Sequence, residues 1–230
     1  MVLKIVRTVW PVMLTYVAIG APCGMIMGQT GMEPWMVFAL SSTFVTGCGQ
    51  FMVCNLWLAG VPVASIVASV AAISSRFALY SASIAPHLAG ASKRQTLAVA
   101  ATLTEEAYGI SLAKLIEGQD WGPRESFALN VILIATWGVS CTMGAVVGAV
   151  VDVPTALAGF VCTSLFICLL FSQRLSRGNA VAAVLAVASV AVCKFLGWTN
   201  VAVPVSVLVG VAAALVCDAL AEGRGARDAR

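Results

Sequence analysis

Apolar positions in this chain form eight long runs separated by short polar breaks. Each run is close to the roughly 20 residues that a helix needs to cross about 30 Å of hydrocarbon. A membrane barrel would instead show short segments of alternating polarity. The pattern therefore predicts an all-α, polytopic transmembrane helical bundle of about 7–8 helices. The runs cover residues 9–28, 35–58, 63–85, 97–113, 127–151, 155–171, 180–196 and 201–217.

Composition supports a membrane protein. Of the 230 residues, 60% are hydrophobic and 10% are charged, with a mean hydropathy of +0.98. A soluble domain could not bury this apolar share in one core. We expect a single transmembrane transporter domain over residues 1–230. Lys4 and Arg7 resemble the start of a signal peptide, but the run that follows is too long, which favours a retained first helix.

The formal net charge is +3, which gives no reason to expect a nucleic-acid partner. Basic residues cluster near the N-terminus, at a few breaks between runs and in the tail 220–230. With eight crossings they fall on one side, and the positive-inside rule makes that side cytoplasmic. We therefore expect a multi-pass protein of the cytoplasmic membrane with a cytoplasmic tail. Lys93 and Arg94 are exceptions in this count.

The eight cysteines lie within apolar runs and form no CxxC pair. This pattern indicates small buried hydrophobes rather than disulfides or a metal site. With one histidine, His87, a zinc site cannot be built, and we expect no metal and no cofactor. The cysteines are residues 23, 48, 54, 141, 162, 168, 193 and 217.

Two segments of the chain are similar in sequence. "CGMIMGQTGMEP" and "MGAVVGAVVDVP" align with a constant offset that pairs Gly24 with Gly144 and Gly28 with Gly148. An internal duplication, with possible repeats 8–117 and 124–219, would suit a transporter. In a chain with 20 glycines such matches also arise by coincidence.

The first two runs contain candidates for a binding site. Gly20, Gly24 and Gly28 form a double GxxxG around Pro22, a spacing typical of close helix packing. The alternative is that Pro22 and Gly24 open the backbone within the membrane and expose groups that hold a substrate. Gln50 in "TGCGQF" has the same two readings, an interhelical hydrogen bond or a substrate contact.

Charges within the runs are few. Arg76 shares a helical face with Tyr80 and Ser83, and Glu105 and Glu106 fall near the middle of the run 97–113. A central charge costs about 3 kcal/mol, against about 0.5 kcal/mol gained per aliphatic residue. Such a helix inserts only if its carboxylates face protein or water, and protonation lowers the cost. The pair is thus a candidate for proton coupling.

Neighbouring residues on a helix point about 100° apart, so the two glutamates cannot share a direction. Small residues along its face favour Glu106 for a cavity, whereas Glu105, on the face of Tyr108, is expected to pair with Arg76. The alternative is a structural ion pair that only fixes helix register. Lys194 lies near a run end and is expected to reach the interface.

Enzymatic functions find no support. The aspartates lie at run ends or outside the runs, so an intramembrane two-aspartate site has no pair, and the serines have no histidine base and no GxSxG motif. We expect a protein that is not an enzyme.

Several stretches resemble the AzlC family, the large subunit of bacterial branched-chain amino acid exporters linked to azaleucine resistance. They cover most of residues 15–171: "GAPCGMIMG", "TGCGQF", "RFALYSASIAPHL", "LTEEAYGISLAKL", "TWGVSCTMGAVVGA" and "LAGFVCTSLFICLLF". The resemblance implies export of hydrophobic amino acids and a small AzlD-type membrane subunit as partner. The family commonly has histidine where this chain has Phe77, and aspartate where it has Glu105.

The sequence thus predicts a permease subunit that exports small hydrophobic amino acids, driven by protons or the membrane potential. A zwitterion needs one cationic and one anionic contact, for which Arg76 and either Glu105 or Glu106 are the candidates. Further expected contacts are Pro22, Gly24, Gln50, Tyr80 and Tyr108. The competing hypothesis is a non-transporting scaffold whose buried charges specify subunit pairing.

Overall fold

The computed structural model describes residues 1–88, 90–118, 121–150 and 177–198, with isolated positions beyond 159. The described residues form helices and no strand, which confirms the predicted all-α class. The chain divides into two compact units. The first contains Met1–Leu58 and Ser74–Thr163, and the second contains Ala59–Ile73 and Ser164–Arg230.

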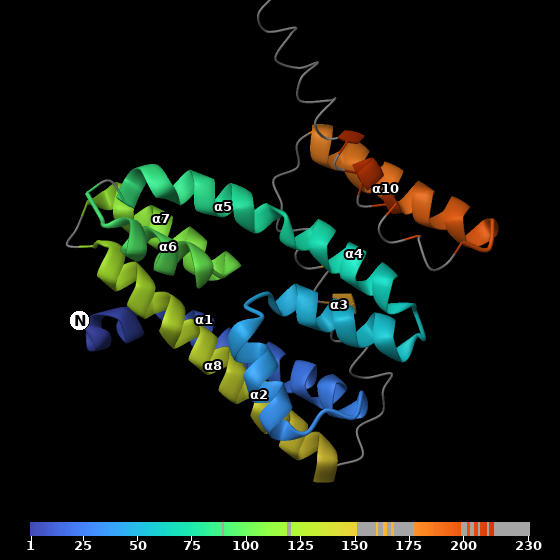
Figure 1. Cartoon of the computed structure of the whole chain (residues 1–230), viewed down its shortest axis with the longest axis horizontal. Helices are drawn as coiled ribbons and strands as arrows, with labels where there is room; N and C mark the ends of the chain where they lie inside the picture. Colours follow the sequence, from blue (N-terminus) through green and yellow to red (C-terminus); the bar gives the residue numbers. More distant parts are fainter. Residues whose placement is uncertain are drawn as a thin grey trace, which may run out of the picture. The chain divides into compact units, whose positions relative to one another are not determined.

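The first unit is built on two helices of 28 residues, α1 (Val2–Gln29) and α8 (Pro123–Val150). Each is about 42 Å long at 1.5 Å per residue, enough to cross a bilayer. They pack side by side, and α2 (Pro34–Thr43) packs against α8 (Figure 1). A glycine on each helix permits this approach, because a Cβ at Gly24 would collide with the backbone of Cys141, and one at Gly144 with that of Ala21.

The backbone around Pro22 and Gly24 is not opened. The helix α1 continues through Pro11 and Pro22 to Gln29, so this expectation is wrong, and the close-packing alternative is confirmed. A proline removes one helical hydrogen bond. The contact of Gly20 and Gly24 with α8 offsets that loss by fixing the helix against its neighbour.

The glycine contacts are reciprocal. Gly24 meets Cys141 while Gly144 meets Ala21, so positions separated by the offset noted in the sequence exchange equivalent contacts. Two duplicated helices related by a two-fold axis would pack in this way. The duplication itself stays a prediction, because the runs 155–171 and 201–217 lie mostly outside the described residues.

Two predicted helices are each interrupted. The run 35–58 forms α2 and α3 (Gly47–Leu58), and the run 97–113 forms α6 (Lys93–Ala101) and α7 (Glu105–Glu117). The expectation of one helix per run is therefore wrong here. The third run forms α4 (Val63–Ser74), α5 (Arg76–Ile84) and the 3-10 helix η1 (Ala85–Leu88), which follow one another as a single helical segment, Val63–Leu88.

The second unit contains α4 and α10 (Arg177–Phe195). Within it, Gly210 lies against Ala182 and Ala186 of α10. The described part of α10 overlaps the run predicted at 180–196. The tail 220–230 lies outside the described residues.

Three helical segments in the described part of the chain are long and apolar enough to cross a membrane: Val2–Gln29, Val63–Leu88 and Pro123–Val150. They identify a helical membrane protein. The predicted total of about eight crossings is not reached among these residues, because two of the runs are divided into shorter helices and two others are mostly undescribed.

Candidate functional site

The break between α2 and α3 is held by Gln50, whose side chain is fully buried. Its Nε2 donates to the carbonyl of Phe44, and its Oε1 accepts from Trp137 Nε1 at 2.9 Å and from Ser41 Oγ at 3.2 Å. Thr46 Oγ1 accepts from the amide of Gly49. These hydrogen bonds satisfy backbone and side-chain polar groups that would otherwise have no partner at the interruption of the helix.

Replacing Gln50 with Leu is expected to destabilise the protein by about 2–4 kcal/mol, because it leaves the buried Trp137 Nε1 and the Phe44 carbonyl without partners. Gln50→Glu keeps an acceptor for Trp137 but loses the amide donor to the Phe44 carbonyl and buries a carboxyl group, so it should be destabilised as well. Thermal unfolding of the detergent-solubilised protein measures the effect. An unchanged unfolding midpoint for the Leu variant would contradict this role of Gln50.

The break between α6 and α7 is fixed by α8. Asn130, which is fully buried, donates through Nδ2 to the Val99 carbonyl and to Thr102 Oγ1, both at 3.0 Å. Thr104 caps α7, because its Oγ1 accepts from the amide of Ala107. Threonine side chains that bond to the local backbone favour such caps over helix interiors.

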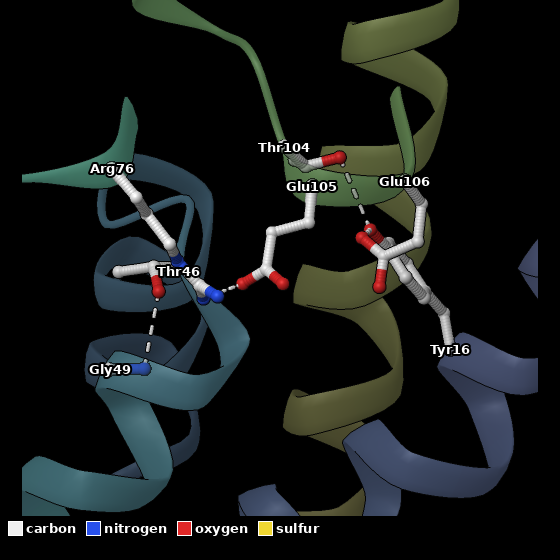
Figure 2. Close-up of polar contacts among 7 residues, drawn as sticks. All are labelled: Tyr16, Thr46, Gly49, Arg76, Thr104, Glu105 and Glu106. Carbon is white, nitrogen blue, oxygen red and sulfur yellow. Dashed lines mark hydrogen bonds and ion pairs between the residues drawn. The ribbon is translucent and has the colours of Figure 1, made fainter. Parts of the chain in front are cut away.

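Consequently Glu105 and Glu106 begin α7 rather than lying mid-helix. The prediction that the two residues lie near the middle of one continuous helix is wrong, because the run 97–113 is interrupted between α6 and α7. The two carboxylates nevertheless meet different partners, Arg76 and Tyr16 (Figure 2). The first turn of a helix is also a position at which acidic residues are favoured.

Glu105 forms an ion pair with Arg76 at the start of α5, as the sequence predicted. The side chains are 22% and 30% exposed, so the pair is shielded yet reachable. Cys48 in the first turn of α3 interacts with both partners. Arg76 thus lies beside the N-terminus of α3, and its buried Nε has no hydrogen-bond partner in the described structure.

Glu106 contacts a different helix. Tyr16 of α1 donates its hydroxyl to Glu106 Oε2 at 2.6 Å, and Thr104 Oγ1 lies 3.2 Å from the same hydroxyl (Figure 2). The Tyr16 ring packs edge-on against Trp137, with 5.3 Å between centroids. Tyr16 is buried, whereas Glu106 is exposed on this unit.

The depth of this cluster follows from the long helices. Tyr16 lies at the midpoint of α1, and its ring partner Trp137 lies at the midpoint of α8. If both helices span about 30 Å of hydrocarbon, the carboxylate of Glu106 lies near its centre. The side chains of this cluster therefore gather where three short helices begin, α3, α5 and α7, halfway along α1 and α8.

An aromatic group lies next to the ion pair. The rings of Tyr80 and Tyr108 stack with centroids 4.5 Å apart, and Phe77 meets Tyr80 edge-on at 5.7 Å. The guanidinium of Arg76 lies over Phe77 at 5.7 Å from its centroid. Tyr108 also donates its hydroxyl to Ser83 Oγ at 3.0 Å. Phe77 thus contacts Arg76 through a cation–π interaction. Unlike a histidine at this position, its ring has no group that binds or releases a proton.

The structure brings together five of the predicted site residues, Arg76, Tyr80, Glu105, Glu106 and Tyr108. It places Pro22 and Gly24 in the α1–α8 contact and encloses Gln50 at the α2–α3 break. Sequence reasoning missed Tyr16, Thr104, Asn130 and Trp137. Only Thr104 carried a readable signal, as a threonine directly before two acidic residues, which is a helix-start pattern.

Other sequence expectations concern isolated residues. The cysteines that the structure describes, 23, 48, 54, 141 and 193, are buried, as predicted. His87 lies exposed in η1 with its Nδ1 3.3 Å from the Ser83 carbonyl. No group of three His, Cys, Asp or Glu side chains suited to a metal occurs in the described ranges.

Long apolar helices, with shorter ones that begin around a few charged side chains, identify a helical membrane protein. The AzlC protein family model matches residues 11–151, more than half of the chain and a span that contains the whole cluster. The chain belongs to the AzlC family. No curated protein and no solved structure matches it.

Proposed function

We propose that this chain is the permease subunit of a bacterial exporter of branched-chain or other small hydrophobic amino acids. It works in the cytoplasmic membrane by secondary transport driven by protons or the membrane potential. A small AzlD-type membrane subunit is its proposed partner. Membership of the AzlC family supports the transport class, and the site supports the kind of solute.

The observation that carries the proposal is the Arg76–Glu105 pair at the interrupted helices. An amino acid carries a carboxylate and an ammonium only a few bonds apart, and this pair presents the two complementary charges. The pair neutralises itself when the site is empty. A zwitterion can then replace both internal contacts at once, with its carboxylate on Arg76 and its ammonium on Glu105.

The start of α3 supports this orientation. The first amides of a helix have no intrahelical partner and favour anions. Thr46 accepts from the amides of Gly49 and Gln50, while those of Gly47 and Cys48 precede them in the same turn, beside Arg76. Transporters commonly direct such half-helix N-termini at substrate carboxylates.

The rings of Tyr80 and Tyr108 offer an apolar surface for the substrate's side chain. They are partly buried and stacked, and so lose little freedom on binding. We leave Pro22, Gly24 and Gln50 out of the proposed contact set because the structure uses them for packing and for holding a helix break.

Counterflow in proteoliposomes tests the proposal. Vesicles that contain the protein and are preloaded with unlabelled leucine should take up labelled leucine, with and without a candidate small subunit as parallel samples. Lysine, which adds a second cationic group, should not compete, whereas valine and isoleucine should. Absence of counterflow in every sample would overturn the proposed function.

A further inference from the structure

Glu105 and Glu106 are adjacent but make unlike contacts. Glu105 is bound to a cation, Arg76, whereas the side-chain partner of Glu106 is the neutral hydroxyl of Tyr16, at 2.6 Å. Among the described residues the ion pairs are Arg76–Glu105 and Lys114–Glu117, so neither involves Glu106. The two carboxylates are therefore suited to different tasks.

The difference lies in what protonation would cost. A proton on Glu105 would leave the guanidinium of Arg76 without its counter-ion, which is expensive in a low-dielectric site. A proton on Glu106 breaks no ion pair and removes a charge that has no cationic contact. Tyr16 can donate its hydroxyl to the neutral acid as well as to the carboxylate.

Position adds a second argument. Glu106 is tied to the midpoint of α1 and is exposed on the first unit. An ionisable group at this depth faces protein or water rather than lipid. Access for protons and a place halfway across the membrane are the two requirements for a group that takes up a proton from one side and releases it to the other.

We infer that Glu106 is the proton-carrying group of this transporter and that Tyr16 is its positioning residue. The inference rests on the proposed function. In the step, the Glu106 carboxylate binds one proton from the aqueous phase on one side, forms the neutral acid, and later releases that proton to the other side. Tyr16 keeps its own proton throughout.

Among the residues that the structure describes, few other titratable groups lie near Glu106. Tyr16 faces it from α1, and Glu105 neighbours it on α7. Beyond Glu105 lie Arg76 of α5 and Cys48 of α3. The helix α8 contributes Trp137, which does not titrate, through its contact with Tyr16. Substrate bound between Arg76 and Glu105 would alter the field at Glu106, and so couple the two events.

The test separates exchange from uphill transport. In proteoliposomes with an imposed pH gradient, Glu106→Gln should lose uphill accumulation of labelled leucine while counterflow, which needs no net proton movement, persists. Glu117→Gln is the matched control, since Glu117 lies on the same helix in an exposed pair with Lys114. Its accumulation should equal that of the unmodified protein.

Tyr16→Phe gives an independent readout. Loss of a hydrogen bond to the ionised form favours the acid, so the pH of half-maximal accumulation should rise by about one unit or more. A role of Tyr16 limited to packing would leave this profile in place, because Phe keeps the ring against Trp137. Tyr16→Phe also provides a test of the inference if Glu106→Gln fails to reach the membrane.

The outcomes are distinguishable. If the unmodified protein shows no counterflow, the proposed function fails. If it accumulates leucine uphill and Glu106→Gln does the same, the inference about Glu106 is overturned while the transport function stands. An unshifted pH profile in Tyr16→Phe would overturn the role given to Tyr16.

Discussion

Replacing Arg76 with Ala is expected to abolish leucine counterflow. The substitution removes the proposed carboxylate contact and leaves Glu105 without its counter-ion. Truncating one partner of a shielded charge pair weakens the binding free energy by about 2–5 kcal/mol. At subsaturating substrate this corresponds to a loss of roughly 30-fold or more in the transport rate. Initial rates of counterflow across a range of leucine concentrations measure the effect.

Lys114→Ala is the control for this experiment. Lys114 forms the other ion pair of the described structure, within α7, with Glu117, whose side chain is 48% exposed. An exposed pair contributes little, so its removal should leave the rate unchanged. Counterflow by Arg76→Ala at the rate of the unmodified protein would contradict the proposed binding site.

The exchanged pair, Arg76→Glu with Glu105→Arg, separates transport from assembly. A scaffold whose charges only specify packing should tolerate the exchange, because an ion pair is restored. A zwitterion site should not, because the new carboxylate would occupy the position beside the N-terminus of α3 that is proposed for the substrate carboxylate, and would repel it. Normal folding without counterflow is the expected result. Normal counterflow would contradict the proposal that Arg76 is an oriented contact for the substrate carboxylate.

The second large effect is expected at the α1–α8 contact. A Cβ at Gly24 would collide with the backbone of Cys141, and a backbone cannot rotate away as a side chain can. Overpacking costs about 1–3 kcal/mol even where side chains adjust. Gly24→Ala should therefore lower stability by at least about 3 kcal/mol and reduce the yield of monodisperse protein.

Gly109→Ala is the matched control. Gly109 lies within α7 and has no atom within 4 Å of an added Cβ. Alanine there should be neutral or stabilise the helix by up to about 1 kcal/mol. The thermal unfolding midpoint in detergent measures both variants. Equal midpoints for Gly24→Ala and Gly109→Ala would show that the α1–α8 contact tolerates a wider spacing than the structure gives.

The sequence by itself determined the class of the protein. Runs of about 20 apolar residues can be buried only in a bilayer, and their length requires helices. The few charges within these runs stood out because each is costly there. The pairing of Arg76 with Glu105 could be foreseen for the same reason, since an intramembrane charge needs a counter-ion.

Only the tertiary structure decided where the helices break and which carboxylate meets which partner. The interruptions near Thr46 and Thr104 depend on Gln50, Trp137 and Asn130, whose hydrogen bonds join residues far apart in the sequence. Hydropathy averages over such breaks, because a few threonines change the mean of a window of about 20 residues very little. The contact of Tyr16 with Glu106 spans 90 positions, and it joins α1 and α7, which both pack against α8.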